Sequence, residues 1–204
     1  MKKIAIIGAT GRVGGQLVQE SLRRGHRVTA IARHATALAA QSGLSPLDID
    51  VLDGAALYDA LAGHEAVLSA VRFVDAPPSA IIDPVKRAEV PRLLVVGGAA
   101  SLLTATGRRV FDDPAFPAAY RDEAAAGIAF LESLRRDPSL NWTFLSPSAL
   151  FDGTQRTGSF RLGQDHLLVG ADGISRISFP DFAIAMIDEL ERPAHSRQRF
   201  TVGY

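Results

Sequence analysis

The sequence contains no cysteine, which excludes disulfide bonds, a thiolate zinc site and a cysteine nucleophile. Its five histidines are scattered without the spacing of metal ligands, so we expect no metal site. The 204 residues carry no net charge, because 22 basic side chains balance 22 acidic ones. The basic residues form no patch, and we therefore expect no nucleic-acid partner.

Long apolar runs are also missing. No stretch approaches the roughly 18 apolar residues of a membrane span, so we expect no membrane association. The apolar run after Lys2 and Lys3 is too short for a signal peptide, and Arg12 interrupts it. These absences predict a soluble cytoplasmic protein. Hydrophobic residues make up 47% of the chain, which is enough for the core of one domain over residues 1–204.

What the sequence does have is a glycine-rich segment between a predicted strand and a predicted helix. The apolar run Ile4-Ala5-Ile6-Ile7 precedes Gly8-Ala9-Thr10-Gly11-Arg12-Val13-Gly14-Gly15. Helical periodicity follows, and Arg23-Arg24-Gly25 is typical of a helix end. A turn that opens a helix directs free backbone N–H groups and a partial positive charge at one place, where a pyrophosphate can bind.

The glycine spacing is GxxGxxG rather than the GxGxxG of the dinucleotide fingerprint, because Ala9 stands at the second glycine position. A second predicted strand, Arg27–Ile31, supports dinucleotide binding. The alternative is a tight turn that only packs the helix on the sheet, which does not require three regularly spaced glycines. The candidate cofactor-binding residues of this segment are Gly8, Thr10, Gly11, Arg12, Val13 and Gly14.

Strand-like and helix-like segments alternate along most of the chain. This alternation predicts an α/β fold with a doubly wound parallel sheet, a Rossmann fold with strand order 3-2-1-4-5-6. From residue 148 the rhythm changes, and residues 148–204 are expected to form a small C-terminal extension on the substrate side. The expected strands lie at 4–7, 27–31, 47–51, 66–70, 92–96, 142–145 and 200–204, the helices at 35–41, 55–62, 77–89, 119–136 and 178–191, and a small hairpin at 159–162 with 174–178.

Arg33 bears on the choice of cofactor. It lies 19 residues after Gly14, where a dinucleotide fold meets the adenosine ribose. A carboxylate there binds the ribose 2′-hydroxyl, whereas an arginine accommodates a 2′-phosphate. Arg33 and Arg12 with no acid predict NADPH in preference to NADH; the alternative is that Arg33 is a solvated surface residue.

Further cofactor contacts are expected where the predicted strands end. Asp50 can accept a hydrogen bond from the adenine amine and Val51 can lie under the ring, although Asp50 can instead cap a helix, a role that suits Asp53 better. Ligands of open parallel sheets bind at the carboxyl ends of the strands. The remaining candidates at such ends are Ser69, Ala70, Val71, Gly97 and Pro147.

Four stretches resemble the atypical short-chain dehydrogenase/reductases, and more narrowly the small NAD(P)H-binding proteins described as NADH-flavin reductases, relatives of biliverdin/flavin reductase. They are the segments 8–14, 50–53, 142–147 and 156–204, the last with the more specific Arg156-Thr157-Gly158 and Ile177-Ser178-Phe179-Pro180-Asp181-Phe182-Ala183. The resemblance covers nearly the whole chain. It implies a Rossmann fold and a reduced nicotinamide cofactor.

One feature departs from the ordinary short-chain dehydrogenases, many of which use a Tyr-x-x-x-Lys pair with a serine. Tyr120 begins the longest predicted helix, but position 124 is alanine and the only lysines are Lys2, Lys3 and Lys86. A phenol with a pKa of about 10 is a poor acid–base group at neutral pH. Tyr120 and Ser101 are nevertheless the candidate catalytic residues.

The candidate walls of the acceptor pocket are aromatic, cationic or small. The phenylalanines among them can alternatively be core residues, and Arg156 can hold the C-terminal segment by ion pairs. The pair Asp112-Asp113 is more typical of a solvated loop than of a catalytic dyad. The candidates are Arg72, Phe73, Ser101, Phe111, Phe116, Tyr120, Phe151 and Arg156.

These features favour an NAD(P)H-dependent oxidoreductase that transfers hydride to a flavin- or quinone-like small molecule, because hydride transfer between flat rings makes little demand on a proton relay. Flavin is then a substrate. Two alternatives remain: a non-catalytic NAD(P)H-binding redox sensor or scaffold, and an epimerase or lyase acting on a nucleotide sugar, for which the C-terminal part is small. A monomer or homodimer is expected.

Overall fold

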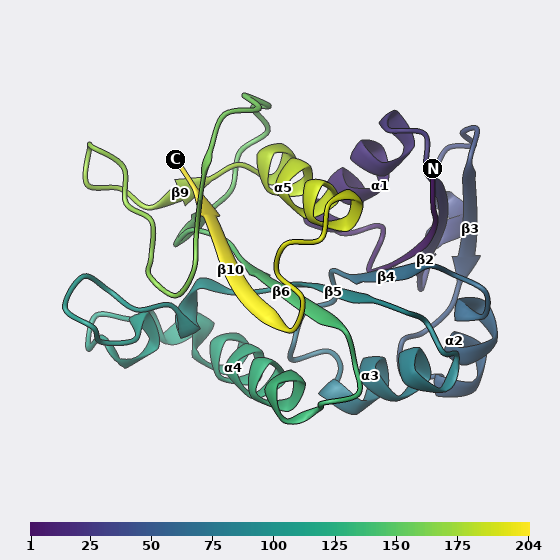
Figure 1. Ribbon diagram of the computed structural model, residues 1–204, viewed down its shortest axis with the longest axis horizontal. Helices are drawn as coiled ribbons and strands as arrows, with labels where there is room; N and C mark the ends of the chain where they lie inside the picture. The colour runs from purple at the N-terminus through teal and green to yellow at the C-terminus, as the bar shows by residue number, and fades with distance from the viewer.

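The computed structural model describes all 204 residues and contains one eight-stranded sheet between two layers of helices. The strand order is β3-β2-β1-β4-β5-β6-β10-β8. In Figure 1, α1 and α5 cover one face of the sheet, and α2, α3 and α4 cover the other. The predicted doubly wound order 3-2-1-4-5-6 is confirmed, and two C-terminal strands extend it.

All neighbours in the large sheet are parallel except β8, which pairs antiparallel with β10. A separate two-stranded sheet joins β7 and β9. The strands are β1 (Lys3–Ile7), β2 (Arg27–Ala32), β3 (Leu44–Asp48), β4 (Ala66–Ser69), β5 (Leu93–Val96), β6 (Trp142–Ser146), β7 (Leu150–Phe151), β8 (Arg161–Gly163), β9 (Arg176–Ile177) and β10 (Gln198–Gly203).

The helices include five α-helices and four single turns of 3₁₀-helix. The longest helix has 16 residues, and no helix has the length and apolar character needed to cross a bilayer. The α-helices are α1 (Arg12–Arg23), α2 (Gly54–Leu61), α3 (Pro78–Arg87), α4 (Arg121–Arg136) and α5 (Phe179–Glu191), and the 3₁₀ turns are η1 (Ala35–Ala37), η2 (Ala99–Ser101), η3 (Val110–Asp112) and η4 (Ala118–Tyr120).

The core lies on both faces of the sheet, which explains why the central strands read as continuous apolar runs. Along β1, Ile4 and Ile6 pack toward α1 and α5, whereas Ala5 and Ile7 pack toward the other helical layer. The carboxyl ends of β1, β4 and β5 are therefore held side by side by a fully buried scaffold.

Two predictions near β3 are wrong. The strand lies at Leu44–Asp48 rather than 47–51, and the predicted helix at 35–41 is only the 3₁₀ turn η1. Asp48 accepts hydrogen bonds from the backbone N–H of Thr36 at 2.8 Å and from its hydroxyl at 2.6 Å, which fixes this tight connection. Because β3 is an edge strand with mostly exposed side chains, no apolar run marks it in the sequence.

The predicted hairpin of 159–162 with 174–178 is also wrong. Instead, β8 pairs with β10, and β9 pairs with β7. The edge of β10 offers unpaired backbone groups to β8, and this pairing is not visible in local sequence patterns. The part after residue 148 thus contributes β8, α5 and β10 to the main layers, while β7 and β9 form the separate small sheet.

A buried carboxylate fixes the loop before β8 to the start of α5. Asp181 is fully buried and accepts hydrogen bonds from the backbone of Thr157 and Gly158, from the Thr157 hydroxyl at 2.5 Å and from the Tyr204 hydroxyl at 2.6 Å. Burial raises the pKa of Asp181, but the hydrogen bonds from Thr157 and Tyr204 outweigh it, so the pKa lies below its ordinary value. Asp181 thus joins the two family-like segments, 156–158 and 177–183, to each other.

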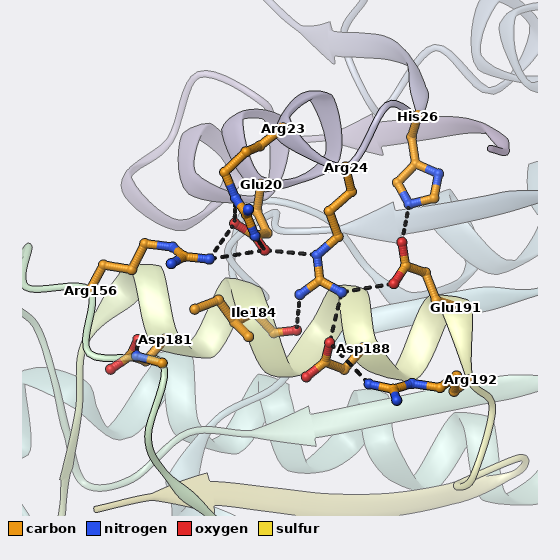
Figure 2. Close-up of polar contacts among 11 residues, drawn as sticks. Glu20, Arg23, Arg24, His26, Arg156, Asp181, Ile184, Asp188, Glu191 and Arg192 are labelled. Atoms are coloured by element: carbon orange, nitrogen blue, oxygen red, sulfur yellow. Dashed lines mark hydrogen bonds and ion pairs between the residues drawn. The ribbon is translucent and has the colours of Figure 1, made fainter.

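Charged side chains join α1 to α5, as Figure 2 shows. Glu20, on α1, accepts hydrogen bonds from Arg23 and Arg24 at 2.6 to 2.9 Å. Arg24 also donates hydrogen bonds to Asp188 and Glu191 on α5. Burial raises the pKa of Glu20, but the two arginines outweigh it and lower the pKa to about 2. The network fixes the helix whose N-terminus carries the glycine-rich segment.

Candidate cofactor and acceptor site

Two of the glycines in the N-terminal turn are required by the geometry of the backbone. Gly8 has φ +80°, and a β-carbon on it would lie 2.8 Å from the carbonyl group of Ala70. A β-carbon on Gly14 would lie 2.0 Å from the carbonyl oxygen of Gly8. These close approaches place the start of α1 directly on the end of β1. Gly11 is the N-cap of α1, with no side chain to cover the helix end.

The first turn of α1 leaves backbone donors free. Gly15 N–H donates to Gly11 at 2.8 Å, but the N–H groups of Arg12, Val13 and Gly14 have no backbone acceptor. Free N–H groups at a helix N-terminus bind anions, and here no acidic side chain occupies the first turn. Val13 contributes this N–H only, because its side chain packs on the core.

A cavity of about 410 Å³ lies beside this turn, at the carboxyl ends of β1, β2 and β4. It brings together eight of the predicted cofactor-binding residues: Gly8, Thr10, Gly11, Arg33, Asp50, Val51, Ala70 and Val71. Six further lining residues were missed by the sequence analysis, and most of them adjoin predicted residues: Ile7, Ile31, Ala32, His34, Leu52 and Asp75. We call this the dinucleotide cavity.

The polar groups of the dinucleotide cavity differ in how they are held. Arg33 is exposed and makes no ion pair or hydrogen bond within the chain, so its guanidinium is available to a ligand. Asp50 lies just beyond β3 rather than at its end, and its Oδ1 accepts a hydrogen bond from Leu52 N–H at 2.9 Å. Asp53 is the N-cap of α2, as expected, and accepts from Ala56 N–H at 3.0 Å.

A larger cavity of about 680 Å³ lies at the carboxyl ends of β5 and β6, next to the dinucleotide cavity in the order of the strands. We call it the acceptor cavity. It contains seven predicted residues: Phe73, Gly97, Ser101, Phe116, Tyr120, Pro147 and Phe151. Its remaining walls, mostly apolar, come from η2, the segment 104–117, the first two turns of α4 and the segment after β6.

The aromatic walls of the acceptor cavity are packed against one another. A β-carbon on Gly97 would lie 2.3 Å from the ring of Phe144, and that ring stacks on Phe73 with centroids 6.0 Å apart. Gly127, on α4, lets the Phe73 ring approach the helix, since a β-carbon there would lie 2.8 Å from it. Gly127 and Phe144 were missed by the sequence analysis because nothing in their local pattern separates them from core residues.

The two candidate catalytic residues have unlike surroundings. Ser101 accepts a hydrogen bond from Arg199 at 3.2 Å, and Arg199 also donates to Asp165 at 2.9 Å. Tyr120 is 65% exposed at the rim, and its hydroxyl has no hydrogen-bond partner within the chain. Ala124 lines the cavity one helical turn further on, so no lysine stands beside the phenol.

Five predicted residues lie elsewhere. The side chain of Arg12 is exposed at the start of α1 and lines neither cavity, so the structure does not bring it together with Arg33. Ser69 is buried within the sheet, and Arg72 lines the dinucleotide cavity rather than the acceptor cavity. Phe111 packs on Phe116 with centroids 5.5 Å apart and does not reach the acceptor cavity. Arg156 lies 3.3 Å from Glu20 on α1, which is the ion-pairing role weighed as its alternative (Figure 2).

Comparison with known proteins decides the family. The family model described as NAD(P)H-binding matches residues 8–190, which includes the glycine-rich turn, both cavities and most of α5. The chain belongs to this NAD(P)H-binding family. The Bacillus subtilis (strain 168) protein YwnB, described as uncharacterized, is 42% identical over 212 residues that cover 98% of this chain and 97% of YwnB.

Several solved structures are similar to the chain over nearly their full length. A Bacteroides thetaiotaomicron protein described as a "putative epimerase" is 40% identical with a TM-score of 0.94, covering 100% of this chain and 97% of its own. A Streptococcus pneumoniae protein described as a "putative NADH-flavin reductase" is 35% identical with a TM-score of 0.83, and the match covers 100% of this chain and 99% of that one. A Veillonella parvula short-chain dehydrogenase/reductase in complex with NADP is 17% identical, so this likeness shows the fold alone. Its TM-score is 0.81, and the match covers 100% of this chain and 95% of that one.

Proposed function

We propose that the protein is an NADPH-dependent reductase that transfers hydride from the nicotinamide to a flavin- or quinone-like acceptor. Its membership of an NAD(P)H-binding oxidoreductase family is the starting point. The observation that carries the proposal is that two cavities of different chemistry adjoin at the carboxyl edge of the sheet. The dinucleotide cavity, beside the glycine-rich turn, is the more polar, and the acceptor cavity next to it is apolar and aromatic.

The dinucleotide cavity suits the adenosine half of the cofactor and its phosphates. The free N–H groups of the first turn of α1 would bind the pyrophosphate, and the close approach at Gly8 leaves the turn without side-chain obstruction. Arg33, unpaired and exposed on this cavity, would bind a 2′-phosphate. The carboxylate of Asp50 lies on the same cavity and would accept a hydrogen bond from the adenine amine.

The acceptor cavity suits a flat ring rather than a sugar. The rings of Phe73, Phe116 and Phe151 line it, and its polar groups are few. The nicotinamide, when bound, supplies the hydride. The chain would hold the two rings in contact and exclude water. Such positioning would accelerate the hydride transfer. The accompanying proton comes from water, because Tyr120 lacks the lysine that would assist it.

The acceptor is a small molecule, and we propose no macromolecular partner, with the chain acting as a monomer or homodimer in the cytoplasm. The test is oxidation of NADPH, followed by its absorbance, with riboflavin or menadione as acceptor. We expect acceptor-dependent oxidation that is faster with NADPH than with NADH. NADPH binding without oxidation by any acceptor in a broad panel would contradict the proposal.

The second candidate is a redox sensor that binds NADPH without turnover. The observation that favours it is the Tyr120 hydroxyl, which has no partner within the chain and no neighbouring lysine. A sensor needs the cofactor to change the structure. Hydrogen exchange in segment 104–117 and in residues 152–160 should then differ between the NADPH-bound and NADP⁺-bound protein, and equal exchange would exclude this candidate.

A further inference from the structure

We infer that the acceptor carries no phosphate: the acceptor cavity selects an uncharged flat ring, such as riboflavin or a quinone, over flavin mononucleotide or a nucleotide-linked substrate. The inference rests on the proposed function in taking this cavity as the acceptor site. It concerns the charge of the ligand, which the proposed function leaves open.

The walls of the acceptor cavity contain no arginine, lysine or histidine. Among the 24 lining residues the only charged side chains are Asp113 and Glu123, and both are acids. A phosphate in this cavity would therefore meet negative charge and no cation. Phosphate binding in proteins relies on arginine, lysine or clustered backbone N–H groups. This cavity has no cation, and the one α-helix N-terminus that lines it, that of α4, already carries the acids Asp122 and Glu123 in its first turn.

The two acids are held in place rather than free to swing away. Glu123 accepts hydrogen bonds from the backbone N–H groups of Phe73 at 2.9 Å and Val74 at 3.2 Å. Asp113 accepts from Ala115 N–H at 2.8 Å through one carboxylate oxygen. The two carboxylates are thus fixed in position, and only Glu123 has a cation beside it, Arg72 at 3.8 Å.

Neighbouring cations do not line the acceptor cavity, although Arg72 lies 3.8 Å from Glu123 on the side of the dinucleotide cavity. Arg109 is paired with Asp112 at 2.8 Å, and Arg199 is buried against Asp165. Arg121 lies over the rings of Phe111 and Phe116 at 5.3 and 5.7 Å from their centroids. In contrast, the dinucleotide cavity contains Arg33 without any partner, so the capacity for phosphate is concentrated on the cofactor side.

The proposed reaction balances with such acceptors. NADPH gives up a hydride, which is two electrons and one hydrogen nucleus, and becomes NADP⁺. Riboflavin or a quinone takes the hydride and one proton from water and becomes the dihydroflavin or the hydroquinone. No step requires a charged group on the acceptor.

The test compares two ligands that share one ring system. Riboflavin and flavin mononucleotide differ only in the phosphate, and the quenching of their fluorescence measures binding to the protein without NADPH. At low salt we expect flavin mononucleotide to bind about tenfold more weakly than riboflavin. This is the repulsion expected between a phosphate dianion and two carboxylates about 9 Å away in a water-like dielectric. Added salt should reduce this difference, because it screens the repulsion.

Asp113→Asn is the informative variant, because asparagine keeps an oxygen for the Ala115 N–H and removes the charge. We expect it to narrow the preference for riboflavin about threefold. Asp59→Asn is the matched control: Asp59 is exposed on α2, makes no ion pair and does not line the cavity, so the loss of its charge should leave the preference unchanged.

The outcomes separate this inference from the proposed function. Equal binding of the two flavins, or no binding of riboflavin and menadione, overturns the inference whatever the turnover. Preference for riboflavin without acceptor-dependent NADPH oxidation supports the charge selection and contradicts the proposed reductase. Preference for riboflavin with oxidation supports both.

Discussion

Gly14 and Gly8 are in direct contact across the glycine-rich turn: a β-carbon on Gly14 would lie 2.0 Å from the Gly8 carbonyl oxygen. This contact brings the first turn of α1 onto the end of β1 and aims its free N–H groups over the edge of the sheet. The second glycine of the usual fingerprint is Ala9 here, whose side chain is fully buried in the core. The turn therefore keeps its close backbone contact with a different glycine spacing.

The first prediction concerns this contact. Gly14→Ala forces the helix start away from Gly8, and we expect it to destabilise the protein by about 1–3 kcal/mol, as overpacking does, and to weaken NADPH binding. Gly15→Ala is the control, because its β-carbon would have an ordinary 3.8 Å contact with Ala9. Thermal unfolding and NADPH titration of both variants measure the difference. Equal behaviour of the two variants would show that the contact is not required.

The second prediction concerns Arg33. Arg33→Ala should weaken NADPH binding by about 1.5–3 kcal/mol, the contribution of a hydrogen bond to a charged group, which is roughly 10- to 100-fold in affinity. Binding of NADH should not change, because NADH lacks the 2′-phosphate. Arg27→Ala, at the opposite end of β2, is the control. An unchanged NADPH affinity in the Arg33 variant would assign the 2′-phosphate to another group.

The third prediction concerns Tyr120. Its hydroxyl has no hydrogen-bond partner within the chain, and Ala124 stands where a lysine would be needed. Tyr120→Phe should therefore change kcat by less than about threefold, whereas the loss of a general acid costs about 100-fold or more. Steady-state kinetics with riboflavin or menadione measures this. A hundredfold fall in kcat would identify the phenol as the proton donor after all.

The fourth prediction concerns the ion pairs between α1 and α5. The pKa of Glu20 is lowered to about 2, so its carboxylate stabilises the fold above its ordinary pKa of 4.5, and this stabilisation is lost as the pH falls toward 2. Glu20→Gln should cost about 2–3 kcal/mol of unfolding free energy at pH 7 and flatten the pH dependence between 4.5 and 2.

Glu132→Gln is the control for Glu20, because Glu132 forms an exposed ion pair with Arg135 on α4 and should contribute less than about 1 kcal/mol. Urea unfolding at a series of pH values measures both variants. If the Glu20 variant kept the pH dependence of the unmodified protein, the acid lability would lie in other carboxylates.

The central sheet could be predicted from the sequence because its strands are apolar on both faces, and Ile4–Ile7 and Leu93–Val96 have no other place in a folded chain. The edge elements could not. β3 is half-exposed and contains Pro46, and the partners of β8 and β9 are distant in the sequence. Local periodicity says nothing about such pairings.

The candidate site divides in the same way. Residues of the glycine-rich turn, Arg33 and the segment at Asp50 could be placed because a known ligand geometry links them. The walls of the acceptor cavity were harder to predict from the sequence, because a phenylalanine that faces a cavity and one that faces the core have the same local pattern. Phe111 and Arg156 were placed at the cavity by sequence and lie away from it, while Gly127 and Phe144 needed the fold.

The central claim is that the turn at Gly8–Gly14 binds the phosphates of a reduced nicotinamide dinucleotide. Calorimetric titration of the purified protein with NADPH, and separately with NADH, tests this claim most directly. The account predicts saturable binding of one NADPH per chain, tighter than that of NADH. Absence of heat and of saturation with both nucleotides would contradict it.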